Sequence, residues 1–419
     1  MRLLGAVRSP LYRNALSIWA STGIASLGGL AFWAIVAARY TPEEVGLGSA
    51  AVSAITLLAV LAHLGLGYGL IRYLPQAGSD GPYLINGSFG IAGLASVVAA
   101  VAFLGGIPLW APRLEFLRGE PAYVVAFGTF VAAATVGLVL DNLFIAHRRA
   151  EFTLLKYAAM NLVRVLVPIP LALFIGPFGI VAASGVAALV GLVLGVFLIG
   201  RVERGYRPAI VLSRRHAVGI LPFAVGNYLA DLTLVAPGMI LPIMVMNLLD
   251  GAHAGYFYIA WFMGSFLHYA STSLALSMFA EGAHAPDSLR SVASRALPAS
   301  LLLAGLGAMA VFLAGDHILL VFGQDYAREG GDALRLVALA AVPAAVTNVY
   351  LGIERARGGM KGLIGVSAVV AAVTLGLSYV AIPELGITGG AVGLLAGQTA
   401  GAWLGVAILV FGRRYRHRP

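Results

Sequence analysis

Apolar stretches of about 20 residues, separated by short polar or Gly-Pro turns, recur along the whole chain. As a helix, each stretch is long enough to cross the ~30 Å hydrocarbon core of a bilayer. Helices satisfy their own backbone hydrogen bonds where no water is present, so a helical form is expected. The pattern predicts twelve membrane-spanning helices, approximately at 14–38, 45–71, 84–107, 121–146, 156–175, 179–200, 217–246, 254–280, 293–314, 333–353, 362–382 and 388–412.

Small residues recur at every fourth position in two of these helices. The last helix carries Gly389, Gly393, Gly397, Gly401 and Gly405, and the sixth carries Ala183, Ala187, Gly191 and Gly195. Such a ridge lets a neighbouring helix approach closely. The repeat predicts two six-helix bundles, 1–200 and 217–419, joined by a basic linker at 201–216. Because six is even, we expect a pseudo-two-fold axis along the membrane normal.

Composition makes this an all-α polytopic membrane protein. Hydrophobic residues form 60% of the 419 and charged residues 11%, with a mean hydropathy of +0.92, whereas soluble domains carry roughly 25% charge. The loops predicted on the side of the termini are net positive and the opposite loops net negative. Arg and Lys mark the cytoplasmic side, so both termini are expected there, in a multi-pass protein of the cytoplasmic membrane.

Enzyme signatures are missing from the sequence. It has no cysteine, no phosphate-binding Gly-x-x-x-x-Gly-Lys and no His-Glu-x-x-His. We therefore expect a monomeric protein that is not an enzyme and has no metal, no cofactor and no nucleic-acid partner. The alternative of a glycan polymerase or glycosyltransferase depends on the outer-loop carboxylates Asp325, Glu329 and Asp332. The basic linker and tail are expected to contact anionic lipid headgroups.

Charged residues inside spanning helices are the candidates for function, because a charge at the bilayer centre costs ~2.5–3.5 kcal/mol. Arg164, midway along the fifth helix, is predicted either to bind an anion in a central cavity or to pair with Asp141. Asp231, near two prolines of the seventh helix, is a candidate site for H⁺ or Na⁺, as is Asp141. The alternative for Asp231 is a hydrogen bond to Asn227 or a histidine.

Three further residue types could line a cavity. His63 and His268 occupy equivalent helices in the repeat, and Asn142 aligns with Asn348. Each histidine could instead be a packing residue. Arg72 lies at a helix end, where the alternative is that its side chain reaches the lipid headgroups.

The region 33–75 resembles a known family. The segments are Ala37-Ala38-Arg39-Tyr40-Thr41-Pro42-Glu43-Glu44-Val45-Gly46, Leu61-Ala62-His63-Leu64-Gly65 and Arg72-Tyr73-Leu74-Pro75, with Gly179-Ile180-Val181-Ala182-Ala183 further on. They resemble polysaccharide-biosynthesis transporters, the oligosaccharide-lipid flippases of the MOP superfamily, which also includes multidrug-and-toxin (MATE) extruders and lipid II flippases. His63 stands where relatives often have an acidic residue, which puts acid-based coupling there in doubt.

The resemblance implies two bundles in a V, rocking around a cationic cavity that opens alternately to either side. The implied function is a flippase that carries a polyprenyl-pyrophosphate-linked oligosaccharide from the cytoplasmic to the outer leaflet, for cell-surface polysaccharide assembly. Arg164, His63, His268, Arg72 and Asn142 are the expected cavity residues. The alternative is a cation-coupled drug or metabolite extruder that uses Asp231 or Asp141.

Overall fold

The computed structural model describes residues 27–171, 175–203, 206–209, 214–284, 289–357 and 359–415. Within these ranges the chain is helical and has no β-strand. The first helix, Leu27–Arg39, is followed in the N-terminal half by α3 (Pro42–Ala62), α4 (Leu66–Tyr73), η1 (Leu74–Gln76), η2 (Gly78–Asp80), α5 (Gly81–Trp110), η3 (Pro112–Arg118), α6 (Pro121–Ala146), α7 (Ala150–Leu166), α8 (Pro168–Leu171) and α9 (Pro177–Ile199). The C-terminal half contains α10 (Arg214–Leu248), α11 (Gly251–His284), α12 (Leu289–Leu320), α13 (Gln324–Arg357), α14 (Met360–Leu385) and α15 (Ile387–Tyr415).

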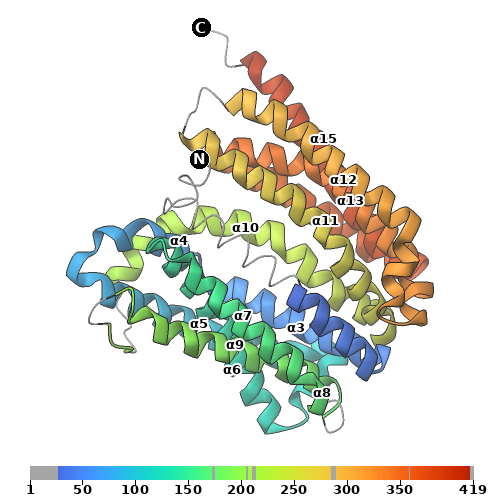
Figure 1. Cartoon of the computed structure of the whole chain (residues 1–419), viewed down its shortest axis with the longest axis horizontal. Coiled ribbons are helices and arrows are strands. Elements are labelled where there is room, and N and C mark those ends of the chain that lie inside the picture. The colour runs from blue at the N-terminus through green and yellow to red at the C-terminus, as the bar shows by residue number, and fades with distance from the viewer. Residues whose placement is uncertain are drawn as a thin grey trace, which may run out of the picture. The chain divides into compact units, whose positions relative to one another are not determined.

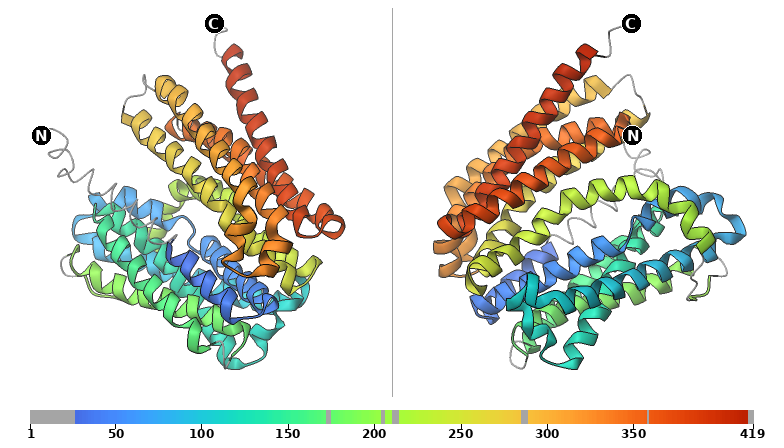
Figure 2. Two further views of the ribbon diagram at one scale, coloured as in Figure 1. Left: turned by 45° about the vertical axis from the view of Figure 1, so that its right-hand side comes forward. Right: turned by 180° about the vertical axis from the view of Figure 1, so that it is seen from behind.

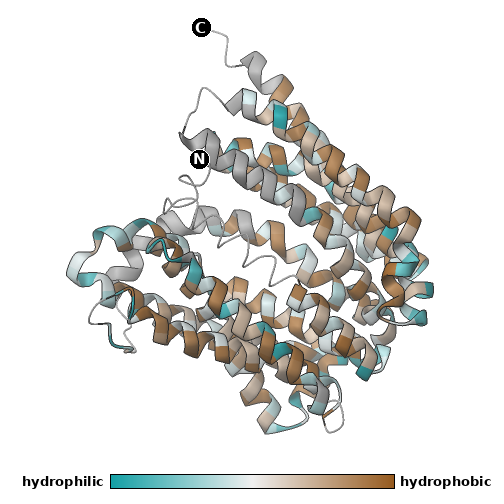
Figure 3. Ribbon diagram, viewed as in Figure 1, coloured by the Kyte–Doolittle hydropathy of each residue, from teal (hydrophilic) through white to brown (hydrophobic). Residues whose placement is uncertain are grey.

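Eight of the described helices are long and apolar enough to cross a membrane: α3, α5 (counted with η2), α6, α9, α12, α13, α14 and α15. Leu27–Arg39 and Leu232–Leu248 are shorter apolar helices. Brown hydrophobic residues run along these helices and teal hydrophilic residues gather at their turns (Figure 3). Many large apolar side chains are exposed, among them Leu313 at 80% and Trp403 at 75%. Lipid tails, rather than water, suit such a surface, and the protein is a polytopic membrane protein.

The chain forms two compact units, Met1–Tyr228 and Leu229–Pro419, which divide inside α10. In the first unit, α3, α6 and α9 pack against one another (Figure 1). In the second, α13 packs against α11, α12 and α15, and Figure 2 shows these yellow-to-red helices running together. The segment 206–209, within the predicted linker, is held to the first unit: Tyr206 donates to Asn86 Oδ1 (3.0 Å) and Asn86 Nδ2 donates to Arg207 O (2.9 Å).

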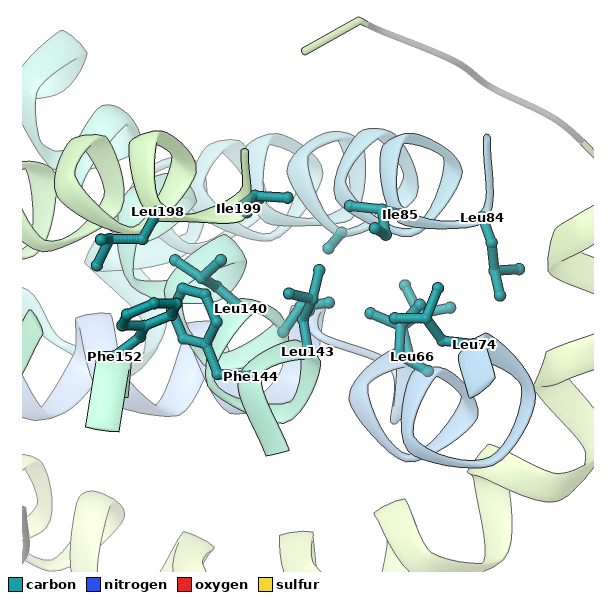
Figure 4. Packing of buried hydrophobic residues seen from close by; sticks show 13 residues of the cluster. Leu66, Leu74, Leu84, Ile85, Leu140, Leu143, Phe144, Phe152, Leu198 and Ile199 are labelled. Carbon is teal, nitrogen blue, oxygen red and sulfur yellow. The ribbon is translucent and has the colours of Figure 1, made fainter. Parts of the chain in front are cut away.

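A buried apolar cluster joins the helices of the first unit at one end. Leu66 of α4 and Leu143 of α6 are fully buried there, and Phe152 of α7 lies beside Phe144 of α6, with 5.6 Å between the ring centres (Figure 4). Ile199 closes the cluster from the end of α9. Lipid tails are as apolar as these side chains, so the hydrophobic effect does not drive them together inside a membrane. Close van der Waals packing stabilises the cluster instead.

The predicted helix 45–71 differs from the structure at both ends and in the middle. It begins earlier, at Pro42, because Thr41 and Glu44 form a capping box: Glu44 N donates to Thr41 Oγ1 (3.3 Å) and Thr41 N donates to Glu44 Oε2 (2.9 Å). It then breaks after Ala62, where Leu64 (φ 49°) and Gly65 (φ 69°) adopt left-handed backbone. A continuous helix was therefore a wrong prediction.

The glycine ridge of the last helix is confirmed. A Cβ at Gly397 would lie 2.7 Å from the carbonyl oxygen of Val370 on α14, and one at Gly393 would lie 2.7 Å from that of Thr374. Only glycine permits this approach. Ser378 Oγ of α14 uses it to donate to Gly390 O of α15 (3.2 Å), a hydrogen bond between neighbouring helices.

Candidate functional site

A pocket of about 190 Å³ lies inside the first unit, between α3, α6, α7 and α9; we call it the N-terminal pocket. Arg164, Asn161 and Tyr157 line it from α7. The guanidinium of Arg164 lies 4.3 Å from the centre of the Phe32 ring, a distance suited to a cation–π contact. Across the pocket, Ser184 Oγ of α9 is buried and has no hydrogen-bond partner among the described residues. Arg164 thus lines a pocket within the first unit, and its role in binding an anion stays a prediction.

Asp141 pairs with Lys156, not with Arg164. Lys156 Nζ lies 2.6 Å from Asp141 Oδ1 and also donates to Gly137 O (3.1 Å), while Tyr157 OH donates to Asp141 Oδ2 (3.1 Å). The Lys156 side chain is only 3% exposed. These groups line a second cavity of about 130 Å³, the inner pocket. The alternative of an Arg164–Asp141 pair is therefore replaced by a pair that sequence reasoning missed.

The Lys156–Asp141 pair was not predicted because α7 begins earlier than the sequence pattern indicated. The sequence pattern placed Lys156 at the cytoplasmic end of a helix beginning at 156, but α7 begins at Ala150. Lys156 is therefore about 9 Å along the helix from its start, at 1.5 Å per residue. Gly191 of α9 leaves room for its stem: a Cβ there would lie 3.3 Å from Lys156 Cγ.

A pocket of about 450 Å³ lies inside the second unit and is called the C-terminal pocket. His268, Thr272 and Asn348 form one polar side, where Asn348 Nδ2 donates to Thr272 Oγ1 (3.3 Å) and His268 Nε2 lies 3.2 Å from Val337 O. Arg355 also lines this pocket. The other residues that line it are Leu234, Val235, Pro237, Gly238, Met239, Trp261, Ser265, Ala344, Leu351, Gly352, Val370, Thr374, Leu394 and Gln398.

The other predicted cavity residues lie elsewhere in the first unit. His63 is 8% exposed, with Nδ1 2.7 Å from Val60 O and its ring centre 5.4 Å from that of Tyr228. Asn142 Nδ2 donates to Leu138 O of its own helix (3.0 Å). Arg72 is exposed on α4, 5.6 Å from the Tyr73 ring. None of the three lines the three pockets described above.

Asp231 lies on α10, but its side chain falls outside the part of the structure that is described, as does that of Asn227. The carboxylates considered for an enzyme lie on the first turns of α13. Glu329 pairs with Arg328 (2.8 Å) and Asp332 with Arg335 (3.0 Å). No group of three His, Asp or Glu side chains suited to a metal ion occurs among the residues that the structure describes.

A further titratable pair lies at the end of the first unit. His147, which follows α6, has Nε2 3.4 Å from Glu203 Oε2, which follows α9. Burial lowers the pKa of this imidazole, and the nearby carboxylate opposes that shift without cancelling it. The pair joins two turns that the sequence placed on the same side of the membrane.

No family model matches the sequence, and no curated protein matches it either. Several solved structures are similar to this chain. The chain superposes on an inward-facing multidrug resistance MATE family transporter of the MOP superfamily with a TM-score of 0.69, at 16% identity over 93% of this chain and 94% of the other. An outward-facing one gives 0.64 at 15% identity over 97% and 95%.

A third structure is a MOP superfamily transporter from Pyrococcus furiosus, described as having a binding pocket of reverse polarity that suggests a different function. Its TM-score is 0.66, at 14% identity over 97% of this chain and 95% of the other. Because the superpositions extend over nearly the full length of each chain, the protein has the fold of the MATE transporters of the MOP superfamily.

Proposed function

We propose that the protein is a flippase that moves a lipid-pyrophosphate-linked oligosaccharide across the cytoplasmic membrane by alternating access, for cell-surface polysaccharide assembly. One observation carries the proposal: the N-terminal and C-terminal pockets each have an arginine in their lining, Arg164 and Arg355. Neither lining, as described, includes an Asp or Glu. An anionic cargo fits such interiors, since Arg binds phosphate through paired, charge-assisted hydrogen bonds.

The Lys156–Asp141 pair strengthens this argument. Asp141 is the acidic residue that lines the inner pocket, and the ammonium group 2.6 Å away balances its charge. It therefore subtracts little from the positive field of Arg164. The residues described in the linings of the N-terminal and C-terminal pockets thus include arginine and no carboxylate, which suits an anionic headgroup.

The C-terminal pocket also suits a sugar. The amides of Asn348 and Gln398 can donate and accept hydrogen bonds. Trp261 and the aliphatic residues of the lining supply the apolar surface that ligand pockets generally have. A volume of about 450 Å³ is within the ordinary range for a small-molecule site.

The test is transport of a fluorescent short-chain polyprenyl-pyrophosphate oligosaccharide by protein reconstituted into vesicles, followed by quenching of the outer leaflet. Arg164→Ala and Arg355→Ala should each slow flipping by about tenfold or more, because each removes a charged partner of phosphate. Arg328→Ala is the matched control, since this arginine is 78% exposed and outside the pockets. Unchanged flipping in both pocket variants would contradict the proposal.

The alternative is a cation-coupled extruder of drugs or metabolites. It is favoured by the superposed structures that are described as multidrug resistance transporters. The Pyrococcus furiosus transporter, with its pocket of reverse polarity, suggests that this fold serves other cargoes too. In that case Asp231→Asn should abolish export of a cationic dye, while Arg164→Ala should leave it active.

A further inference from the structure

Lys156 is a charged side chain buried inside a transporter fold, and its position needs an explanation beyond stability. Its ammonium contacts Asp141 Oδ1 (2.6 Å) and Gly137 O (3.1 Å), and lies 4.8 Å from the centre of the Tyr157 ring. Replacing a buried ion pair by apolar groups of similar volume is often neutral or stabilising. The pair is therefore a weak source of stability and a candidate for a switch.

The pair lies beside the cavity that contains Arg164. The inner pocket and the N-terminal pocket share five lining residues, Thr56, Ala134, Tyr157, Met160 and Ala188. Tyr157 connects them chemically, because it lines both pockets and donates its hydroxyl to Asp141 Oδ2 (3.1 Å). A change in the charge of Asp141 is thus felt in the space where Arg164 would meet a phosphate.

We propose that Asp141 and Lys156 form a proton-gated anion site, in which a proton on Asp141 releases Lys156 to bind an anionic headgroup beside Arg164. The proton comes from water and binds the carboxylate of Asp141. The ammonium of Lys156 then exchanges Asp141 for the anion as its partner. This inference rests on the proposed function, because it takes the cargo to be a lipid-linked phosphate or pyrophosphate.

Thermodynamic linkage determines whether a proton on Asp141 raises or lowers the affinity for the anion. An anion in the pocket repels the Asp141 carboxylate and competes for Lys156, so it favours the protonated form. By reciprocity, protonation must raise the affinity for the anion by the same factor. Proton and cargo therefore bind together; in an exchange mechanism they would exclude each other.

The surroundings of Asp141 contain few other titratable groups. Lys156 and Tyr157 of α7 are the groups that interact with it electrostatically. The helix α9 has no titratable residue, and α3 has only Glu43 and Glu44, in its first turn. The titratable residue of α5 is Tyr83, near its start, and α4 has Tyr68, Arg72 and Tyr73. Among the groups around the inner pocket, the proton taken up is therefore assigned to Asp141, and the Asp141→Asn variant distinguishes it from uptake at His268 of the C-terminal pocket.

The experiment measures protons taken up when farnesyl pyrophosphate binds the purified protein in lipid nanodiscs. Calorimetry is run at about pH 7.5 to 9, where the ligand is already ionised, in two buffers of different ionisation enthalpy. At some pH within that range, the wild-type protein should take up about one proton for each anion that it binds. Uptake near zero at every pH, with binding intact, would overturn the inference.

Two variants distinguish the contribution of Asp141 from that of Lys156. Asp141→Asn mimics the protonated carboxylate, so uptake should fall to near zero and affinity at high pH should rise by about tenfold. In the double variant Asp141→Asn with Lys156→Met the affinity should fall again by about tenfold. The double variant leaves no unpaired buried charge, and thermal unfolding verifies that it folds. Asp316→Asn, in the ion pair with Arg335 of the second unit, is the matched control and should behave like wild type.

The two proposals fail differently. If wild type binds farnesyl pyrophosphate no better than farnesol at any pH, the anionic cargo of the proposed function is wrong. If it prefers the pyrophosphate but Asp141→Asn still takes up a proton, the flippase proposal stands and the gated site is rejected. Inorganic pyrophosphate in place of the farnesyl compound shows whether the lipid tail is needed.

Discussion

At the residue scale, two charged side chains of α7 lie inside the first unit: Arg164 lines the N-terminal pocket, and Lys156 pairs with Asp141 at 2.6 Å. Arg164 and His268 were found because a titratable group inside an apolar helix needs a reason, and both line pockets. Lys156 was missed because the sequence pattern placed it at a helix start, where a lysine normally reaches outward, whereas α7 begins six residues earlier, at Ala150. Its inward path depends on Gly191, across the bundle on α9, and no local pattern contains that information.

His147 provides a test at this scale. Because burial lowers the pKa of its imidazole from the ordinary 6.5, the unfolded chain binds a proton more readily than the folded one. The stabilising contribution is full above about pH 6.5 and is lost as pH falls through the lower pKa of the folded protein. His147→Gln should therefore lose less thermal stability than wild type between about pH 8 and pH 5. Unfolding in detergent, followed by tryptophan fluorescence, measures this.

His317→Gln serves as the control, since this imidazole is exposed on α12 in the other unit. It should keep the wild-type pH dependence. Equal acid sensitivity of wild type and His147→Gln would show that the burial of His147 contributes nothing to the pH profile.

At the element scale, periodic features were predictable and interruptions were not. The glycine ridge of α15 is a repeating signal in the sequence, and the structure places α14 directly on it. The break after α3 leaves no such signal, because apolar residues continue through Leu64, Gly65 and Leu66. Glycine is common in membrane helices, so Gly65 alone did not indicate a left-handed residue.

Two glycine-to-alanine substitutions test the ridge. At Gly397 the new Cβ would collide with Thr374 and lie 2.7 Å from Val370 O, so the substitution should destabilise the protein by about 1–3 kcal/mol. At Gly376 of α14 a Cβ meets nothing within 4 Å, so the change should be neutral or stabilise by up to about 1 kcal/mol. Denaturant unfolding in mixed micelles compares them. Equal effects would mean that the α14–α15 approach is not tight.

At the scale of the whole molecule, composition and apolar periodicity were enough to predict an all-helical membrane protein, and the structure agrees. The arginine and lysine bias of the loops further predicts that both termini face the cytoplasm. This orientation is a prediction from the sequence. It is well suited to experiment, because the chain contains no cysteine and every introduced thiol is the only one present.

Glu115→Cys and Arg148→Cys form the pair for this test. Both residues are exposed, the first on η3 and the second in the turn between α6 and α7. With a membrane-impermeant maleimide added to intact cells, Glu115→Cys should be labelled and Arg148→Cys should not. Permeabilised cells, in which both should react, provide the control. The reverse pattern would invert the predicted topology.

The interruption between α3 and α4 has a consequence for α10. A helix that stops at Ala62 leaves the carbonyls of its last turn without amide donors from the next turn. Tyr228 of α10 uses one of them, donating its hydroxyl to Leu61 O at 2.8 Å. In an unbroken helix, that carbonyl would instead accept the backbone amide four residues further on. The break that the apolar pattern did not predict thus provides the hydrogen-bond acceptor that holds Tyr228, the last residue of the first unit, to the end of α3.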